Sequence, residues 1–135
     1  MKRPPRLASV MTPFPYSLDA GACVGDAWAM MDEHGVHHLP VKDGDEIVGI
    51  ITNLAVQGRD AQTPVSSVYT RDPYVVELST ALEGVLRDMA SRHLGSAIVT
   101  REGRLAGVFT CGDACLAFAE HLAELFPPPG GDEAA

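Results

Sequence analysis

The sequence predicts an α/β fold in which two copies of one β-α-β-β-α unit form a two-sheet sandwich with outer helices. The first observation is a repeat without gaps: Val10-Met11-Thr12-Pro13 aligns with Val68-Tyr69-Thr70-Arg71, an offset of 58 residues. The second is the apolar pattern, which recurs at that offset in the pairs Leu39/Ala97, Ile47/Leu105 and Ile50/Val108. The third is the same order of strand-like and helical spacing in each copy. Such copies pair about a pseudo-two-fold axis, where ligands often bind.

Each copy opens with an extended segment followed by a helix. Prolines keep the segments out of the helical region, and the apolar residues after them recur at helical spacing. Gly35 is predicted to end the first helix, and Ser79-Thr80 to begin the second. The extended segments cover residues 14–18 and 73–76, and the helices cover residues 24–34 and 82 to 92 or 93.

Two strands and a closing helix complete each copy. A glycine-bearing turn between two apolar runs predicts a β-hairpin in both copies. The closing helix of the first copy is short, whereas that of the second is long and carries an apolar stripe that should be buried. The strands are predicted at residues 38–42, 46–51, 96–100 and 104–109, and the closing helices at residues 53–57 and 112–126.

The repeat divides the chain of 135 residues, of which 46% are apolar, into four parts. This length and balance suit one compact domain. The last part is rich in proline, glycine and acidic residues, which predicts a disordered tail. The parts are an N-terminal extension (1–9), a first unit (10–62), a second unit (63–126) and the tail (127–135), with a linker at residues 58–67.

The acidic composition excludes several classes of partner. A formal net charge of −8 argues against general affinity for nucleic acid or for anionic membranes, which both need a basic surface. No apolar segment follows the basic N-terminus as in a signal peptide, and no run is long enough to span a membrane. Three cysteines without framework spacing predict reduced thiols and a cytoplasmic protein.

Four short motifs occur in order: Val10-Met11-Thr12-Pro13, Gly35-Val36-His37-His38-Leu39-Pro40-Val41, Ile47-Val48-Gly49-Ile50-Ile51-Thr52 and Gly107-Val108-Phe109-Thr110-Cys111-Gly112-Asp113. Together they resemble a tandem cystathionine-β-synthase-type (CBS) domain pair, called a Bateman module. The resemblance covers roughly residues 7–120 and leaves no room for a catalytic domain. It therefore implies two CBS units in a stand-alone regulatory module that is not an enzyme.

The family's ligand motif is Gly-h-x-Thr/Ser-x-x-Asp, where h is apolar. Its Asp accepts hydrogen bonds from ribose hydroxyls, and its Thr begins a helix whose free N–H groups can hold phosphate. The second unit carries the motif complete, and the resemblance implies that the opening segment and helix–strand turn of the first unit complete the site. The implied ligand-binding residues are Thr12, Pro15, Ser17, Val36, His37, His38, Pro40, Thr110, Gly112 and Asp113.

The opposite site is predicted to be weaker. Ala55 stands where the ribose-binding Asp would be, and the turn lacks a basic residue, so we expect this site to be empty or differently occupied. Its residues would be Thr52, Thr70, Pro73, Val75, Leu94 and Ser96, together with Gly95.

Structural roles for the same residues stay open. Asp113 can serve only as a helix cap, and the two motif threonines can be N-caps. The histidines at 34, 37 and 38 cluster, but no cysteine or carboxylate lies at ligand spacing, so no metal site is predicted. Cys111 and Cys115 are predicted to fill the core rather than to sense redox state.

The sequence thus predicts a regulatory module that binds an adenine nucleotide in one cleft between its units. AMP is the first choice, ADP and ATP are possible, S-adenosylmethionine is an alternative, and no cofactor is required. Binding would change affinity for an unidentified effector protein, and the outer helices would form a homodimer. The rival prediction is a dimerising interaction module with degenerate ligand sites.

Overall fold

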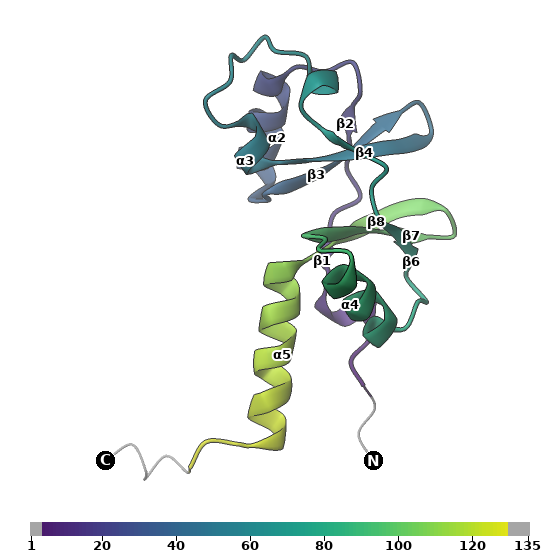
Figure 1. Cartoon of the computed structure of the whole chain (residues 1–135), viewed down its shortest axis with the longest axis vertical. Coiled ribbons are helices and arrows are strands. Elements are labelled where there is room, and N and C mark those ends of the chain that lie inside the picture. The colour runs from purple at the N-terminus through teal and green to yellow at the C-terminus, as the bar shows by residue number, and fades with distance from the viewer. Residues whose placement is uncertain (1–3, 130–135) are drawn as a thin grey trace.

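The computed structural model describes residues 4–129 and contains two four-stranded sheets, one above the other in Figure 1. The strand orders are β2-β3-β4-β5 and β1-β8-β7-β6. Ile98 and Val108 of the second sheet belong to the same buried cluster as Leu39 and Ile50 of the first, so the sheets share a core. The predicted α/β sandwich of two related units is confirmed. The strands are β1 (Thr12–Pro13), β2 (Leu18–Asp19), β3 (His38–Asp43), β4 (Glu46–Thr52), β5 (Thr70–Arg71), β6 (Val75–Glu77), β7 (Ser96–Arg101) and β8 (Arg104–Thr110).

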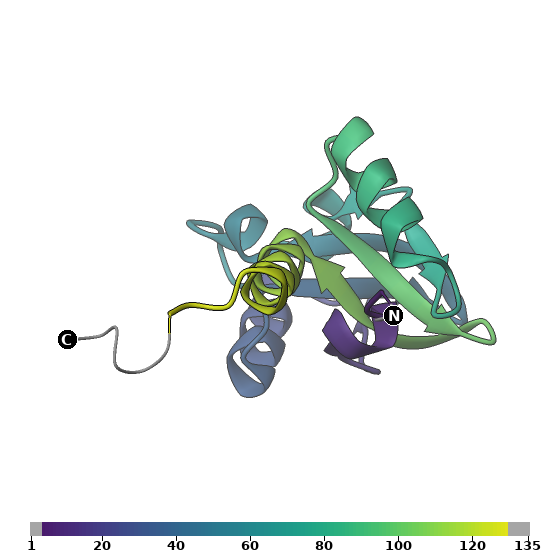
Figure 2. The same cartoon turned by 90° about the horizontal axis from the view of Figure 1, so that it is seen from below.

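Helices lie on the outer sides of the sheets (Figure 2). Gly35 adopts φ 64° and ends the first long helix, as predicted. The predicted start at Ser79-Thr80 is wrong, because the Thr80 N–H closes a turn onto the Glu77 carbonyl and the helix begins only after Ala81. The helices are α1 (Leu7–Val10), α2 (Val24–His34), α3 (Asn53–Val56), the 3-10 helix η1 (Val65–Ser67), α4 (Leu82–Ser91) and α5 (Cys111–Leu125).

The opening segment of each unit crosses to the sheet of the other unit. β1 pairs with β8, and β5 pairs with β4. The preceding helices follow the same exchange: Leu7 of α1 is buried in the second unit's core and Val65 of η1 in the first's. Leu7 and Val65 are themselves 58 residues apart, so the structural repeat begins at Leu7. Each predicted opening strand is therefore divided between two sheets.

Two buried glycines permit this exchange. Gly107 lies opposite Pro13 in the β1–β8 ladder, and a Cβ there would overlap the carbonyl oxygen of Thr12. Gly49, its counterpart in the first unit, would overlap the ring of Tyr69 if it carried a Cβ. The glycine of the ligand motif thus allows the close approach of the exchanged strand in both units.

The long helix α5 is not covered as predicted. None of its residues is buried, and Leu116 and Phe118 each expose 62% of their surface. Figure 1 shows α5 extending away from both sheets. Cys115, predicted to fill the core, is exposed for the same reason. Apolar spacing predicts that a helix face is covered but does not say by what. Residues 130–135 of the predicted tail lie outside the described residues.

Candidate functional site

The complete motif sits where β8 ends and α5 begins. Thr110 is the N-cap of α5, and its Oγ1 accepts a hydrogen bond from the Asp113 N–H at 3.1 Å. Asp113 returns the contact, because its Oδ2 accepts from the Thr110 N–H at 3.0 Å. This reciprocal capping box is the structural role considered above for both residues. It also fixes the half-buried carboxylate at the N-terminus of a long helix.

Thr12 of the first unit reaches the same carboxylate. Its hydroxyl donates to Asp113 Oδ1 and Oδ2 at 3.1 and 3.2 Å. β1 brings Thr12 there by pairing with β8, since Thr12 lies opposite Val108. A carboxylate offers about four lone-pair positions, so Asp113 keeps capacity for a further donor. The structure therefore places Thr12, Thr110 and Asp113 in one site, as the sequence predicted.

The two histidines lie at the start of β3, facing this site from the first unit. Burial lowers the pKa of half-buried His38 below its ordinary value of 6.5, and the neighbouring His37 lowers it further. The charge of Asp113 acts in the opposite direction, which shows that His38 feels the carboxylate across the unit boundary. His38 is therefore neutral near pH 7 and can gain charge when an anion approaches.

The other residues of the predicted site are accessible to different degrees. Pro15 and Gly112 are exposed, and Ser17 and Val36 are half-buried. Pro40 is fully buried within β3 and faces no open surface. A hollow of about 660 Å³ adjoins the helix–strand turn and is lined by Trp28, Val36, His37 and Asn53, among others.

An aromatic contact beside the site was missed by the sequence analysis. Tyr16 stacks on His34 with ring centroids 4.6 Å apart, which ties the opening segment to the end of α2. The same contact recurs 58 residues on, where the Arg92 guanidinium lies 5.0 Å from the Tyr74 ring. The repeat itself contained this signal, since both aligned tyrosines meet a cationic or aromatic residue one helix later.

The opposite site lacks the chemistry of the first. Thr52 caps α3 by accepting from the Ala55 N–H at 3.3 Å, and no carboxylate stands at position 55. Thr70, the counterpart of Thr12, is exposed. Pro73, Leu94 and Ser96 are half-buried, whereas Val75 exposes 41% of its surface.

Two searches of residues 4–129 bear on other kinds of site. They contain no group of three or more His, Cys, Asp or Glu side chains placed to hold a metal ion. Over the same span, no helix combines the length and apolar character needed to cross a bilayer.

Comparison with known proteins identifies the fold. The chain is 33% identical over 101 residues to the uncharacterized protein YlbB of Bacillus subtilis, covering 69% of this chain and 68% of YlbB. It superposes on CBSX2 in complex with AMP with a TM-score of 0.69 at 24% identity, covering 86% and 97% of the two chains. It superposes on the CBS domain of a bacterial CNNM/CorC family Mg2+ transporter, in complex with ATP, with a TM-score of 0.70 at 25% identity, covering 84% and 87%. The CBS domain family model matches residues 7–54 and 65–120, so the chain belongs to the CBS domain family as a tandem pair.

Proposed function

We propose that this CBS pair is a non-catalytic regulatory module that binds an adenine nucleotide, AMP first, in one cleft between its units. The observation that carries the proposal is the carboxylate of Asp113, held at the start of α5 and reached by Thr12 of the other unit. Two similar structures hold AMP and ATP. The ribose hydroxyls would donate to Asp113, and the phosphates would meet the free N–H groups of the first turn of α5.

One site per chain follows from the asymmetry of the repeat. Asp113 has no counterpart carboxylate, because Ala55 occupies the equivalent position. The first site also has two histidines at its turn, where the opposite site has Gly95 and Ser96. A nucleotide would therefore find both ribose and phosphate partners only at the Asp113 site.

Nucleotide binding would act on the contact between the units. A ribose hydroxyl that binds Asp113 must share or replace the hydrogen bond from Thr12, which anchors the exchanged strand β1. A ligand shifts a conformational equilibrium only by its different affinity for the two states, and this shared bond supplies such a difference. The shift would be transmitted in the cytoplasm to an effector protein by a dimer assembled through the outer helices.

The phosphates would also couple binding to pH. Burial keeps the pKa of His38 low in the free protein, and a nearby phosphate would raise it. The bound state then holds more protons than the free state near neutral pH. Affinity should accordingly increase as pH falls from 8 towards 6.5.

Calorimetric titration of nucleotide-stripped protein with AMP, ATP and S-adenosylmethionine tests the proposal. We expect saturation at one nucleotide per chain and at least a tenfold loss of affinity in Asp113→Ala. Thr52→Ala, which removes the N-cap of α3 in the opposite unit, is the matched control and should bind normally. Far-UV circular dichroism establishes that both variants are folded. Unchanged binding by Asp113→Ala would place the site elsewhere.

The second candidate function is a dimerising interaction module without a ligand. It is favoured by the apolar surface of α5, where Leu116 and Phe118 are mostly exposed. Flat thermal-shift responses to all three ligands, together with a stable dimer, would support this candidate over the first.

A further inference from the structure

The first turns of α2 and α4 are equivalent in the repeat but are covered differently. In the first unit an extended segment, residues 61–65, runs along the start of α2, and we call it the strap. The Val24 N–H donates to the Thr63 carbonyl at 2.8 Å, and the Val65 N–H donates to the Ala22 carbonyl at 3.0 Å. The strap thus supplies a carbonyl acceptor to an N–H that the helix itself leaves unpaired.

The second unit has no such cover within residues 4–129. The strap's counterpart is residues 3–7, by the offset of 58. Leu7 is buried, yet neither a bond from Leu82 N–H to the Pro5 carbonyl nor one from Leu7 N–H to the Thr80 carbonyl is present in this part of the chain. Ala81, the N-cap residue of α4, has no side chain that can accept in their place.

The sequence explains why the counterpart stands off. In the first unit Asp60 organises the strap, because its Oδ1 accepts from the Gln62 N–H at 2.8 Å and its carbonyl from the Thr63 N–H at 3.0 Å. The residues equivalent to Gln62 and Thr63 are Pro4 and Pro5. Proline has no N–H, so this turn cannot form in the second unit.

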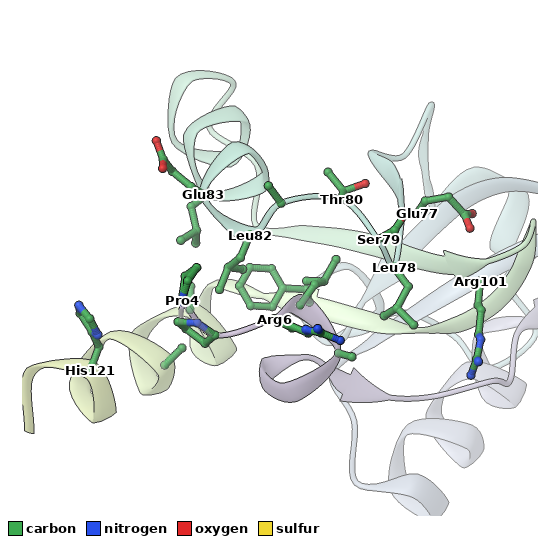
Figure 3. Close-up of a pocket in the computed structure, with 18 of the residues that line it drawn as sticks. Pro4, Arg6, Glu77, Leu78, Ser79, Thr80, Leu82, Glu83, Arg101 and His121 are labelled. Atoms are coloured by element: carbon green, nitrogen blue, oxygen red, sulfur yellow. The ribbon is translucent and has the colours of Figure 1, made fainter. Parts of the chain in front are cut away.

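The uncovered start of α4 opens onto an apolar groove of about 1060 Å³. In Figure 3, Leu78 and Leu82 point from the β6–α4 segment towards Pro4 and Arg6, and His121 of α5 marks the far end. The apolar lining comes mainly from Leu7, Leu78, Leu82, Phe109, Ala117 and Phe118.

The available charge at this groove is positive. Arg6 and Arg101 line it and make no ion pair with any residue between 4 and 129. The acidic Glu83 is already paired with Arg87, at 2.9 Å. Glu77 is engaged by the hydroxyl of Thr100 and by the β7–β8 turn, where its Oε1 accepts from the Glu102 N–H at 2.7 Å.

We propose that this groove binds an extended peptide segment of a partner protein, apolar in character and carrying an acidic residue. The peptide would repeat what the strap does in the first unit: a backbone carbonyl accepts from the Leu82 N–H, and an apolar side chain enters the groove. Its carboxylate would meet Arg6 or Arg101. The groove is separate from the Thr12–Asp113 site, so this proposal does not depend on nucleotide binding.

The strap's own sequence provides the probe. A synthetic peptide Asp-Ala-Gln-Thr-Pro-Val, identical to residues 60–65, is titrated into 15N-labelled protein while amide chemical shifts are followed by NMR. We expect saturable shifts centred on Leu82. Ala117→Trp, which fills the groove, should weaken binding at least tenfold. Ala119→Trp, on the same helix but outside the groove lining, should bind like the unmodified chain.

A graft closes the groove from within. The variant K2D/R3A/P4Q/P5T/R6P gives the N-terminus the strap's sequence and restores the two missing N–H groups. The Leu82 amide should then exchange more slowly with solvent, and the peptide should no longer bind. Absence of saturable shifts at Leu82, or equal binding by Ala117→Trp, would overturn the proposal. Shifts at Leu82 that depend on protein concentration without peptide would do so too, because a second copy would then fill the groove.

Discussion

The hydroxyl of Thr12 bridges both carboxylate oxygens of Asp113, at 3.1 and 3.2 Å, and joins residues 101 positions apart. It connects the strand that the first unit gives to the second sheet with the first turn of α5. The same carboxylate caps α5 by accepting from the Thr110 N–H. A ligand that engages Asp113 therefore acts at once on the helix cap and on the contact between the units.

Thr12→Val tests how much this bond stabilises the fold. Valine keeps the shape but loses the donor, and hydrogen bonds to charged groups contribute about 1.5–3 kcal/mol. Since the site is half-buried, we expect the free energy of unfolding to fall by about 1.5 kcal/mol in urea denaturation. Thr70→Val is the matched control, because this exposed counterpart has no carboxylate to bind and should change stability by less than about 0.5 kcal/mol. Equal losses in both variants would contradict the role assigned to Asp113.

Gly107→Ala tests the exchange of strands. The added Cβ would overlap the carbonyl oxygen of Thr12, which is backbone and cannot rotate away, so β1 must move from β8. Overpacking of this kind costs about 1–3 kcal/mol, and it should also displace Leu7 from the second core. Gly84→Ala is the control, since nothing lies within 4 Å of its Cβ position in α4. Alanine there should raise stability by about 0.5–1 kcal/mol, and a loss of similar size in both variants would argue against the steric explanation.

Ala55→Asp tests why only one site is proposed. It places a carboxylate at the start of α3, in the position that Asp113 has in the other unit. We expect the calorimetric stoichiometry for AMP to rise from one towards two per chain. Leu54→Asp adds the same charge one residue earlier on an exposed side chain, and should leave the stoichiometry at one. A second binding event in both variants would indicate a charge effect without ribose recognition.

His38 predicts a dependence of stability on pH. Its pKa is lowered in the folded chain, mainly by burial, so folding favours the neutral imidazole. Above pH 6.5 both states are neutral and the residue has no effect. As pH falls through 6.5 towards the lowered pKa, the unfolded chain takes up the proton first and stability decreases. His38→Gln should flatten this part of the profile of melting temperature against pH, whereas His37→Gln, at an exposed position, should retain it. An unchanged slope in His38→Gln would assign the effect to another group.

The sequence predicted the strands and long helices to within a few residues, because each has apolar spacing and a clear stop such as Gly35. It also predicted that Thr12, Thr110 and Asp113 share a site, since the repeat implies that each site draws on both units. It did not predict the exchange of β1 and β5. Period-two spacing marks a strand but carries no information about which neighbour it pairs with.

The missed contacts have a similar origin. Tyr16 and His34 meet only because the opening segment turns back over the end of α2, and spacing within a helix does not reveal this. The groove beside α4 became visible only by comparing hydrogen bonds between the repeats. The prolines at positions 4 and 5 were present in the sequence, but their consequence depends on the turn that Asp60 makes in the other unit.

Leu122→Glu tests whether α5 mediates a homodimer. Leu122 lies on the exposed apolar side of a helix with no buried residue, so a charge there should leave the fold of one chain intact. In a dimer buried through this helix, the same charge would be desolvated without a partner, and association should weaken strongly. Light scattering at micromolar concentration should give a dimer for the unmodified chain and a monomer for Leu122→Glu. Leu54→Glu, an exposed leucine on α3, should remain dimeric. A monomeric unmodified chain would remove the dimer from the proposed function and leave the apolar side of α5 to another protein.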